Sequence, residues 1–186
     1  SDNGASADIM VRGEGPDPQA PPGSRKTFLR LGPGWWSCAN TPFRRHKTWV
    51  HEGGISTPLV VHWPAGIRTG GELRRTPGHV IDIVPTVLEA IGVDWPDTVR
   101  GHTQRPIEGT SMRYSFADGA APTRKSRQYF EMFAHRAIWA DGWKATTFHQ
   151  PGHAYDADEW ELFHLDADFS ECHDLSAEHP EKLHEL

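Results

Sequence analysis

The sequence has few cysteines, no long apolar run and no excess of basic residues. Its two cysteines, Cys38 and Cys172, stand far apart and outside any C-x-x-C spacing, so neither a disulfide framework nor a structural zinc knuckle is expected. The formal net charge of −6 argues against nucleic acid as a partner, because phosphate backbones require a concentrated Lys/Arg face. The apolar runs are too short for a membrane-spanning helix. None of these absences identifies the compartment of the protein.

The residues that are present give a globular composition with many turns. Of 186 residues, 37% are hydrophobic and 24% are charged, which suits one domain, or one domain and a piece of another. The 15 prolines and 18 glycines follow no repeat and predict long loops. Residues 11–26 are rich in proline and lack apolar periodicity, and residues 31–46 lack a periodic pattern as well. Both segments are predicted to be irregular, the first as a surface loop.

Two patterns in the middle of the chain predict regular elements. The run Leu59–Trp63 is short, rich in β-branched residues and bounded by prolines, which predicts a strand buried on both faces, as in a parallel sheet. From Val80 to Val93, apolar residues recur at helical spacing and Gly92 ends the pattern. Pro85 must then lie in the first turn of this helix or kink it, because an interior proline costs about 3 kcal/mol.

After a loop rich in Gly, Pro and Asp, the pattern changes to short strands. Turn signals at Asp141-Gly142 and Pro151-Gly152 separate these strands at hairpin distances, so a small antiparallel sheet is expected. Residues 182–186 follow Pro180 and fit a helix close to the last residue. The predicted strands are Gln128–Phe133, Arg136–Ala140, Trp143–Phe148 and Glu161–Leu165.

The first candidate site is Asp2-Asn3-Gly4. Adjacent carboxylate and amide oxygens are hard ligands that suit calcium or magnesium. The same three residues are a common turn sequence, and taken alone they favour the turn over a metal site. Their meaning therefore depends on the rest of the chain.

The second candidate site is Lys47, which stands five residues before Glu52-Gly53-Gly54 and just after an Asn-Thr-Pro-Phe-Arg segment. Together with Asp2-Asn3, this arrangement resembles the sulfatase family, and within it the bacterial arylsulfatases. In that family a Lys so placed reaches the sulfate group, and an upstream Asp-Asn-Gly closes the calcium site. The likeness continues in the family's order through residues 55–64, 81–88, 107–111, 136–138, 141–144, 160–165 and 171–175.

The resemblance implies a site in which Asp2 and Asn3 bind Ca²⁺, with Mg²⁺ as the alternative, and in which Lys47 is both sulfate-binding and catalytic. The small-molecule substrate, a sulfate ester, needs such groups, because a divalent cation and a fixed ammonium stabilise the charge that develops on its oxygens. The family's nucleophile, a formylglycine made from Cys or Ser, is expected upstream, in an N-terminal part of the same protein that acts as the partner of this chain. The chain alone is therefore expected to be inactive.

The fold implied by the resemblance is α/β. It consists of an incomplete alkaline-phosphatase-like mixed sheet followed by a small C-terminal antiparallel sheet with a terminal helix. Residues 1–115 are expected to form the C-terminal portion of the sulfatase catalytic domain. Residues 116–186 are expected to form a small C-terminal α+β subdomain.

Two other functions stay open at this point. Phosphate and phosphonate monoester hydrolases of the same superfamily use overlapping chemistry, and the chain is alternatively a non-catalytic binding module that uses its Trp-rich loop. Histidine pairs such as His46 with His51, or His149 with His153, favour packing or solvated roles over metal binding, because spacing alone is a weak signal.

The other residues around Lys47 have structural interpretations. Glu52 is expected to fix the turn that carries Lys47, and Arg44 either pairs with Glu52 or faces the substrate. Trp49 and the neighbouring tryptophans favour packing, with an apolar wall for an aromatic leaving group as the alternative.

Overall fold

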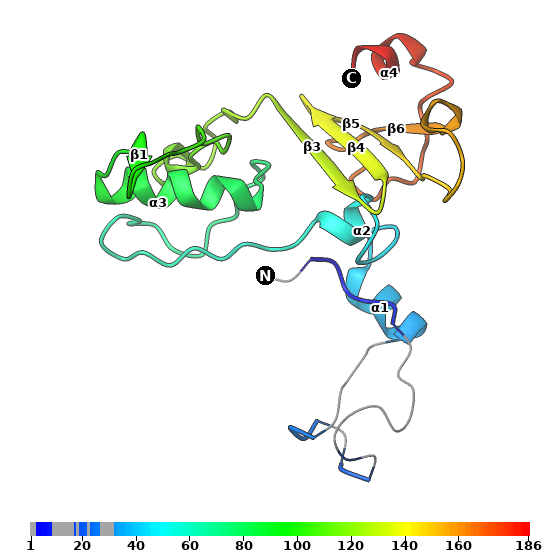
Figure 1. Cartoon of the computed structure of the whole chain (residues 1–186), viewed down its shortest axis with the longest axis horizontal. Coiled ribbons are helices and arrows are strands. Elements are labelled where there is room, and N and C mark those ends of the chain that lie inside the picture. The colour runs from blue at the N-terminus through cyan, green and yellow to red at the C-terminus, as the bar shows by residue number, and fades with distance from the viewer. Residues whose placement is uncertain (1–2, 9–16, 18, 22, 27–31) are drawn as a thin grey trace. The chain divides into compact units, whose positions relative to one another are not determined.

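The computed structural model describes residues 3–8, 17, 19–21, 23–26 and 32–186. The predicted surface loop at residues 11–26 lies partly outside the described residues, and Asp2 lies outside them as well. Two compact units are present (Figure 1): unit 1 comprises residues 1–59 and 129–186, and unit 2 comprises residues 60–128. These units differ from the ranges 1–115 and 116–186, and that predicted division, which concerns a whole sulfatase, stays a prediction.

The main sheet has four antiparallel strands in the order β3-β4-β5-β6. The turn between β4 and β5 is the predicted Asp141-Gly142 pair, whose φ angles of 49° and 81° suit the tight hairpin turns that match strand twist. The predicted small antiparallel sheet is thus confirmed. The strands are β3 (Arg127–Met132), β4 (His135–Ala140), β5 (Trp143–Thr147) and β6 (Trp160–His164).

The core of unit 1 lies around β5, the strand between β4 and β6. The residues of β5 after Trp143 are all buried, so both faces of the strand are covered. Lys144 has apolar cross-strand neighbours, since it is paired with Trp139 on one side and with Phe163 on the other. Ala137, Leu162 and Phe163 have no exposed surface, which defines the apolar centre of the sheet.

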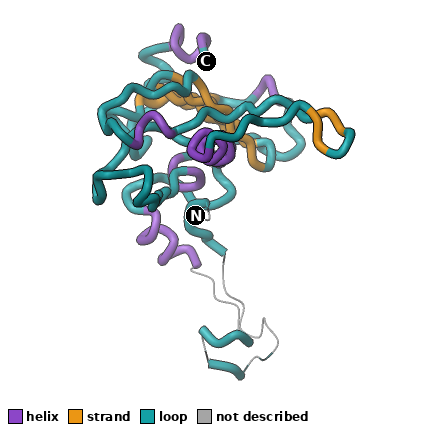
Figure 2. The backbone as a smooth tube through the Cα atoms, turned by 90° about the vertical axis from the view of Figure 1, so that its left-hand side faces the viewer, coloured by secondary structure: helices purple, strands orange, loops and turns teal. Residues whose placement is uncertain are grey.

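Two short helices precede the sheet in unit 1 (Figure 2), namely α1 (Gly32–Asn40) and α2 (Glu52–Ile55). The prediction that residues 31–46 are irregular was wrong over α1. Most residues of this helix are exposed, and a helix that packs no apolar face against a core needs no apolar residues at helical spacing. The sequence pattern therefore did not indicate the helix. The available signals were Pro33, because proline suits a first helical turn, and the buried Asn40 at the helix end.

Unit 1 ends in the predicted terminal helix, α4 (Pro180–Glu185), with proline in its first turn. The ring of His179, just before the helix, packs edge-on against Trp143 of the sheet at 5.4 Å between centroids. A short 3-10 turn, η3 (Tyr155–Ala157), lies between β5 and β6. Of the helices in the described part of the chain, none has the length and apolar character needed to cross a membrane.

Unit 2 contains the predicted long helix. It begins as η1 (Val80–Asp82) and continues as α3 (Ile83–Ile91), and Gly92 ends it with a left-handed φ of 68°. Pro85 is the third residue of α3 and so lies in the first turn, as the sequence required. The other elements of unit 2 are β1 (Thr98–Val99), β2 (His102–Thr103) and η2 (Arg113–Phe116).

The predicted strand at Leu59–Trp63 was wrong. These residues have no regular structure, and Val60 is 88% exposed where full burial was expected. A strand forms only when a neighbouring strand satisfies its backbone N–H and C=O groups, and no described strand pairs with this segment.

The amphipathic helix of unit 2 turns its apolar side outward. The positions Val80, Val84, Val87 and Ile91 follow helical spacing and are all at least half exposed. The buried positions are the polar Asp82 and Thr86. The face that sequence patterning assigns to a core is thus the exposed face, whereas polar contacts hold the inner one.

Asp82 organises the inner face. Its side chain has no exposed surface and accepts hydrogen bonds from the backbone N–H of His79 at 2.8 Å and of Thr110 at 2.7 Å. The buried ammonium of Lys125 lies 3.0 Å from one carboxylate oxygen. One buried carboxylate therefore joins the helix start to two distant loop segments.

Asp82→Asn removes this charge while keeping the size of the side chain. We expect the free energy of unfolding to fall by about 3–5 kcal/mol, because the Lys125 ammonium is left buried without a counter-ion. Urea unfolding followed by tryptophan fluorescence measures the effect. The control is Asp94→Asn, at an exposed position just after the same helix. Equal unfolding midpoints for the two variants would contradict this account.

Candidate functional site

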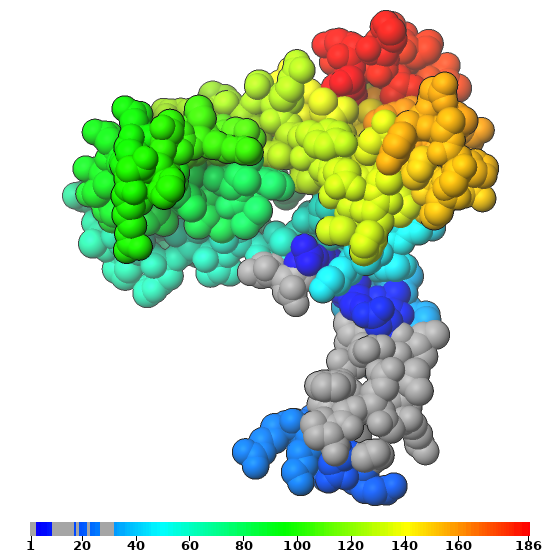
Figure 3. All heavy atoms as spheres, viewed as in Figure 1, coloured from blue at the N-terminus to red at the C-terminus, as the bar shows by residue number. Residues whose placement is uncertain are grey.

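The start of the chain lies against the loop that carries Lys47 (Figure 3). The N–H of Gly4 donates to the carbonyl of Gly54 at 3.0 Å, and the carbonyl of Ala5 accepts from the N–H of Lys47 at 3.1 Å. A Cβ atom on Gly4 would collide with the carbonyl of Gly53, so only glycine allows this approach. Two motifs that are more than forty residues apart in sequence are therefore neighbours in space.

Asn40 holds this arrangement together. Its amide nitrogen donates to the carbonyls of Arg45 at 3.1 Å and Gly53 at 2.9 Å, and its amide oxygen accepts from the N–H of Ala5 at 2.9 Å. The side chain is buried and uses its donors and acceptor on three separate backbone segments. In the sequence, Asn40 stood out only as part of a motif, and the binding of three backbone segments by its side chain was missed.

Lys47 is half-buried, and its ammonium is unpaired. Among the described residues, no carboxylate forms an ion pair with it, and no acceptor forms a hydrogen bond with it. A fixed loop with an uncompensated ammonium suits the binding of an anion. The sulfate-binding and catalytic role of Lys47 stays a prediction.

The metal ligands also stay a prediction. Asn3 is exposed, with a left-handed φ of 45°, while Asp2 lies outside the described residues. Over the described ranges, no group of three or more His, Cys, Asp or Glu side chains is arranged to hold a metal ion. The buried ring of His149 faces the carboxylate of Asp158 at 3.1 Å, which agrees with the structural role expected for it.

A buried ion cluster lies behind the Glu52-Gly53-Gly54 bend. The Lys144 ammonium is 2.7 Å from a carboxylate oxygen of Glu52 and 2.8 Å from one of Glu171. The second oxygen of Glu171 accepts the backbone N–H of Glu52 at 2.9 Å. Lys144 and Glu171 have no exposed surface, and the Glu52 side chain is 15% exposed, so the cluster between the bend and β5 is largely desolvated.

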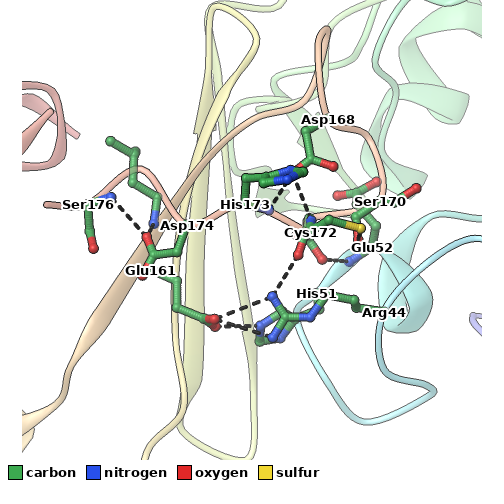
Figure 4. Close-up of polar contacts among 12 residues, drawn as sticks. Arg44, His51, Glu52, Glu161, Asp168, Ser170, Cys172, His173, Asp174 and Ser176 are labelled. Carbon is green, nitrogen blue, oxygen red and sulfur yellow. Dashed lines mark hydrogen bonds and ion pairs between the residues drawn. The ribbon is translucent and has the colours of Figure 1, made fainter. Parts of the chain in front are cut away.

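A second arm extends the cluster to β6 (Figure 4). The Arg44 guanidinium donates to the carbonyl of Glu171 at 2.7 Å and lies 3.3 Å from the Glu161 carboxylate. The ring of His51, buried at 1% exposure, lies 2.9 Å from the other oxygen of Glu161. The His51 hydrogen bond lowers the pKa of Glu161, and the charges of His51 and Arg44 add to this effect against the opposing effect of burial.

These contacts anchor the Lys47 loop to the sheet at two points, through Arg44 before Lys47 and through Glu52 after it. Glu52 has the positional role expected from the sequence, but its partner is Lys144, while Arg44 pairs with Glu161. Lys144 and Glu171 were missed as partners. The only sequence signal was a lysine inside an otherwise apolar and β-branched strand, which requires a buried counter-ion if both faces of the strand are covered.

Lys144→Met tests the cluster. We expect a loss of about 3–5 kcal/mol in the free energy of unfolding, because the buried Glu171 carboxylate and the largely buried Glu52 carboxylate lose their shared cation. Adding Glu171→Gln to the same variant should restore part of the loss. The measurement is urea unfolding by circular dichroism. The control, Lys182→Met, removes a surface i,i+3 pair and should cost at most about 1 kcal/mol. A Lys144→Met variant as stable as this control would rule the cluster out as a stabilising element.

The lowered pKa of Glu161 predicts a pH dependence. A carboxyl group with a lower pKa in the folded state stabilises the protein above its ordinary pKa of about 4.3, and this contribution is lost as the pH falls through the lower folded value. The melting temperature should therefore exceed that of Glu161→Gln at pH 6, and the two should converge below about pH 4. Glu159→Gln, at an exposed neighbouring position, is the control. A gap that stays constant with pH would contradict the assignment.

Comparison with known proteins shows which family the chain resembles. Residues 44–184 match the family described as N-sulphoglucosamine sulphohydrolase, C-terminal. The chain is 31% identical over 167 residues to an uncharacterized sulfatase of Schizosaccharomyces pombe, which covers 88% of this chain and 29% of that protein. An arylsulfatase of Klebsiella aerogenes is 31% identical over 91 residues, covering 48% of this chain and 19% of that protein.

A solved structure agrees at the level of the fold. The crystal structure of Ps i-CgsB superposes with a TM-score of 0.60 at 24% identity, over 78% of this chain and 30% of that one. The chain thus spans 29% to 30% of the length of the relatives that it matches over most of its own length. From the family match, the chain belongs to the sulfatases, which hydrolyse sulfate esters, and it corresponds to the C-terminal region of their members.

Proposed function

We propose that the whole protein is a sulfuric ester hydrolase of the arylsulfatase type, to which this chain contributes a sulfate-binding lysine and two calcium ligands. Lys47 would hold the sulfate oxygens, and Asp2 with Asn3 would complete the metal site. The observation that supports this most is the backbone hydrogen bond from Lys47 to Ala5, because it brings the start of the chain and the lysine loop together.

The chemistry of Lys47 follows from its environment. A sulfate ester develops negative charge on the leaving oxygen as the S–O bond breaks, and a fixed ammonium stabilises that charge without reorganising. Lys47 suits this role because its ammonium has no counter-ion in the described part of the chain and its loop is anchored at Asn40 and Glu52. A mobile surface lysine would first have to be ordered, at a cost in conformational entropy.

The residues at the start of the chain fit a hard cation in donor type. A carboxylate and an amide oxygen are ligands that Ca²⁺ and Mg²⁺ accept, and Gly4 holds the adjoining backbone against Gly54. Calcium would supply a Lewis acid that orients the sulfate, and calcium is the ion we favour. Two ligands do not complete a calcium shell, so the remaining ligands would come from the rest of the protein.

The partner of the chain would be the remaining, N-terminal part of the same protein. That part would carry the formylglycine nucleophile and the other strands of an alkaline-phosphatase-like mixed sheet. Two observations support this. Leu59 in unit 1 is exposed, and so are Val60 and Val61 at the start of unit 2. The apolar stripe of α3 in unit 2 is exposed as well. Exposed apolar surface of this extent on a single domain indicates a surface that another part covers.

Lys47→Ala in the whole protein tests the proposal. We expect kcat for 4-nitrophenyl sulfate to fall by about 10²- to 10³-fold, since one preorganised donor to the developing charge is lost. The rate is followed by the absorbance of 4-nitrophenolate, with calcium present. Lys182→Ala, in the last helix, is the matched control and should keep wild-type turnover.

Two results would contradict the proposal. One is a Lys47→Ala variant with wild-type kcat. The other is a whole protein that hydrolyses 4-nitrophenyl phosphate or a phosphonate monoester better than the sulfate, which would favour the related hydrolases of the superfamily. The chain alone should show no turnover, because it supplies no nucleophile.

A further inference from the structure

A second cation, Arg45, lies two residues before Lys47. Its side chain is exposed, and among the residues that the structure describes no carboxylate forms an ion pair with it. This contrasts with its neighbour Arg44, which is fully engaged with Glu161 and Glu171. In a protein with a formal net charge of −6, an exposed arginine without an acidic partner is available for an anion from outside.

The guanidinium of Arg45 is held in place by an aromatic ring. It lies 4.3 Å from the ring centroid of Trp49, within the range of a cation–π contact. The backbone of Arg45 is fixed as well, because its carbonyl accepts a hydrogen bond from the buried side chain of Asn40. Both the backbone and the guanidinium of Arg45 are therefore held in place, whereas the side chain of a typical surface arginine samples many rotamers.

The aromatic ring that lies against the Arg45 guanidinium is itself part of a cluster of stacked rings. Trp49 stacks on His135 at 5.2 Å with an angle of 7° between the ring planes, and on Phe148 at 5.1 Å. His135 and Phe148 stack on each other at 4.6 Å. Burial lowers the pKa of His135, and the nearby His149 and His51 lower it further, while Glu131 and Asp158 raise it. Arg45, unlike a histidine, carries a permanent positive charge at this cluster.

We propose that Arg45 binds a second anionic group of the substrate, so that the preferred substrate is a sulfate ester carrying a further sulfate or carboxylate. This inference rests on the proposed function, in which Lys47 holds the sulfate that is cleaved. The planar guanidinium pairs with two oxygens of a sulfate or carboxylate at once, which an ammonium does not. Trp49 positions the guanidinium of Arg45, and Trp49 itself need not contact the substrate.

The test compares substrates with one and with two anionic groups. The whole protein is assayed with a sugar monosulfate, the corresponding disulfate, and a sugar that bears one sulfate and one carboxylate. We expect wild-type kcat/KM to be about tenfold to a hundredfold higher for a doubly anionic substrate, mainly through a lower KM. The two doubly anionic sugars show which anion Arg45 prefers.

Arg45→Gln should reduce this preference about tenfold or more, and Trp49→Leu should reduce it in the same direction. Trp49→Phe keeps an aromatic face and should retain most of it. Arg68→Gln, at an exposed and unpaired arginine of unit 2, changes the net charge equally and should leave the preference as in the wild type. Far-ultraviolet circular dichroism checks that each variant is folded.

The outcomes separate the two proposals. If the whole protein hydrolyses sulfate esters but Arg45→Gln leaves the substrate preference unchanged, the inference about Arg45 is wrong and the proposed function stands. If the whole protein hydrolyses neither these sugar sulfates nor 4-nitrophenyl sulfate, the proposed function is wrong. Calorimetric binding of the disulfate needs no turnover, and equal affinity of wild type and Arg45→Gln would overturn the Arg45 inference on its own.

Discussion

The buried ammonium of Lys144 is the contact on which the arrangement of unit 1 depends. Two carboxylates meet it away from water, one from the bend at Glu52 and one from Glu171 near the C-terminus. Each carboxylate would be costly to bury alone, because removing a charge from water is repaid only by a close and well-oriented partner. The bend at Glu52 therefore keeps its position only while β5 and the segment around Glu171 keep theirs. Lys47 lies in the loop before this bend, so the Lys144 contacts position Lys47 although Lys47 does not take part in them.

A buried ion cluster often contributes less to stability than apolar side chains of the same volume would, so its main effect is to favour one arrangement of the chain over others. We infer that Lys144 also specifies the register of β5. Side chains alternate between the two faces of a strand, so a slip of one residue would move Lys144 away from both carboxylates and place Ala145 there. Apolar packing around Trp139 and Phe163 tolerates such errors better than an unpaired charge does.

Sequence patterns predicted the elements whose partners are local. The hairpins follow from alternating residues around Asp141-Gly142, and the main helix follows from its spacing and Gly92. The predictions failed where the local sequence does not reveal what the segment packs against. The run at 59–63 has no strand beside it, and α1 has no apolar stripe. Lys144 finds Glu52 across 92 positions in sequence, a pairing that no local pattern reveals.

The two units differ in which residues they bury. Unit 1 buries its apolar residues around β5, and its charges are buried only where they are paired. In unit 2, the polar Asp82 and Thr86 form the inside, while the apolar residues of α3 lie outside. A helix held by hydrogen bonds on one side keeps its shape without covering its apolar side, and that side stays available as a packing surface. The residues of unit 2 with a core-like pattern in the sequence are therefore the ones that the proposed N-terminal part of the protein would cover.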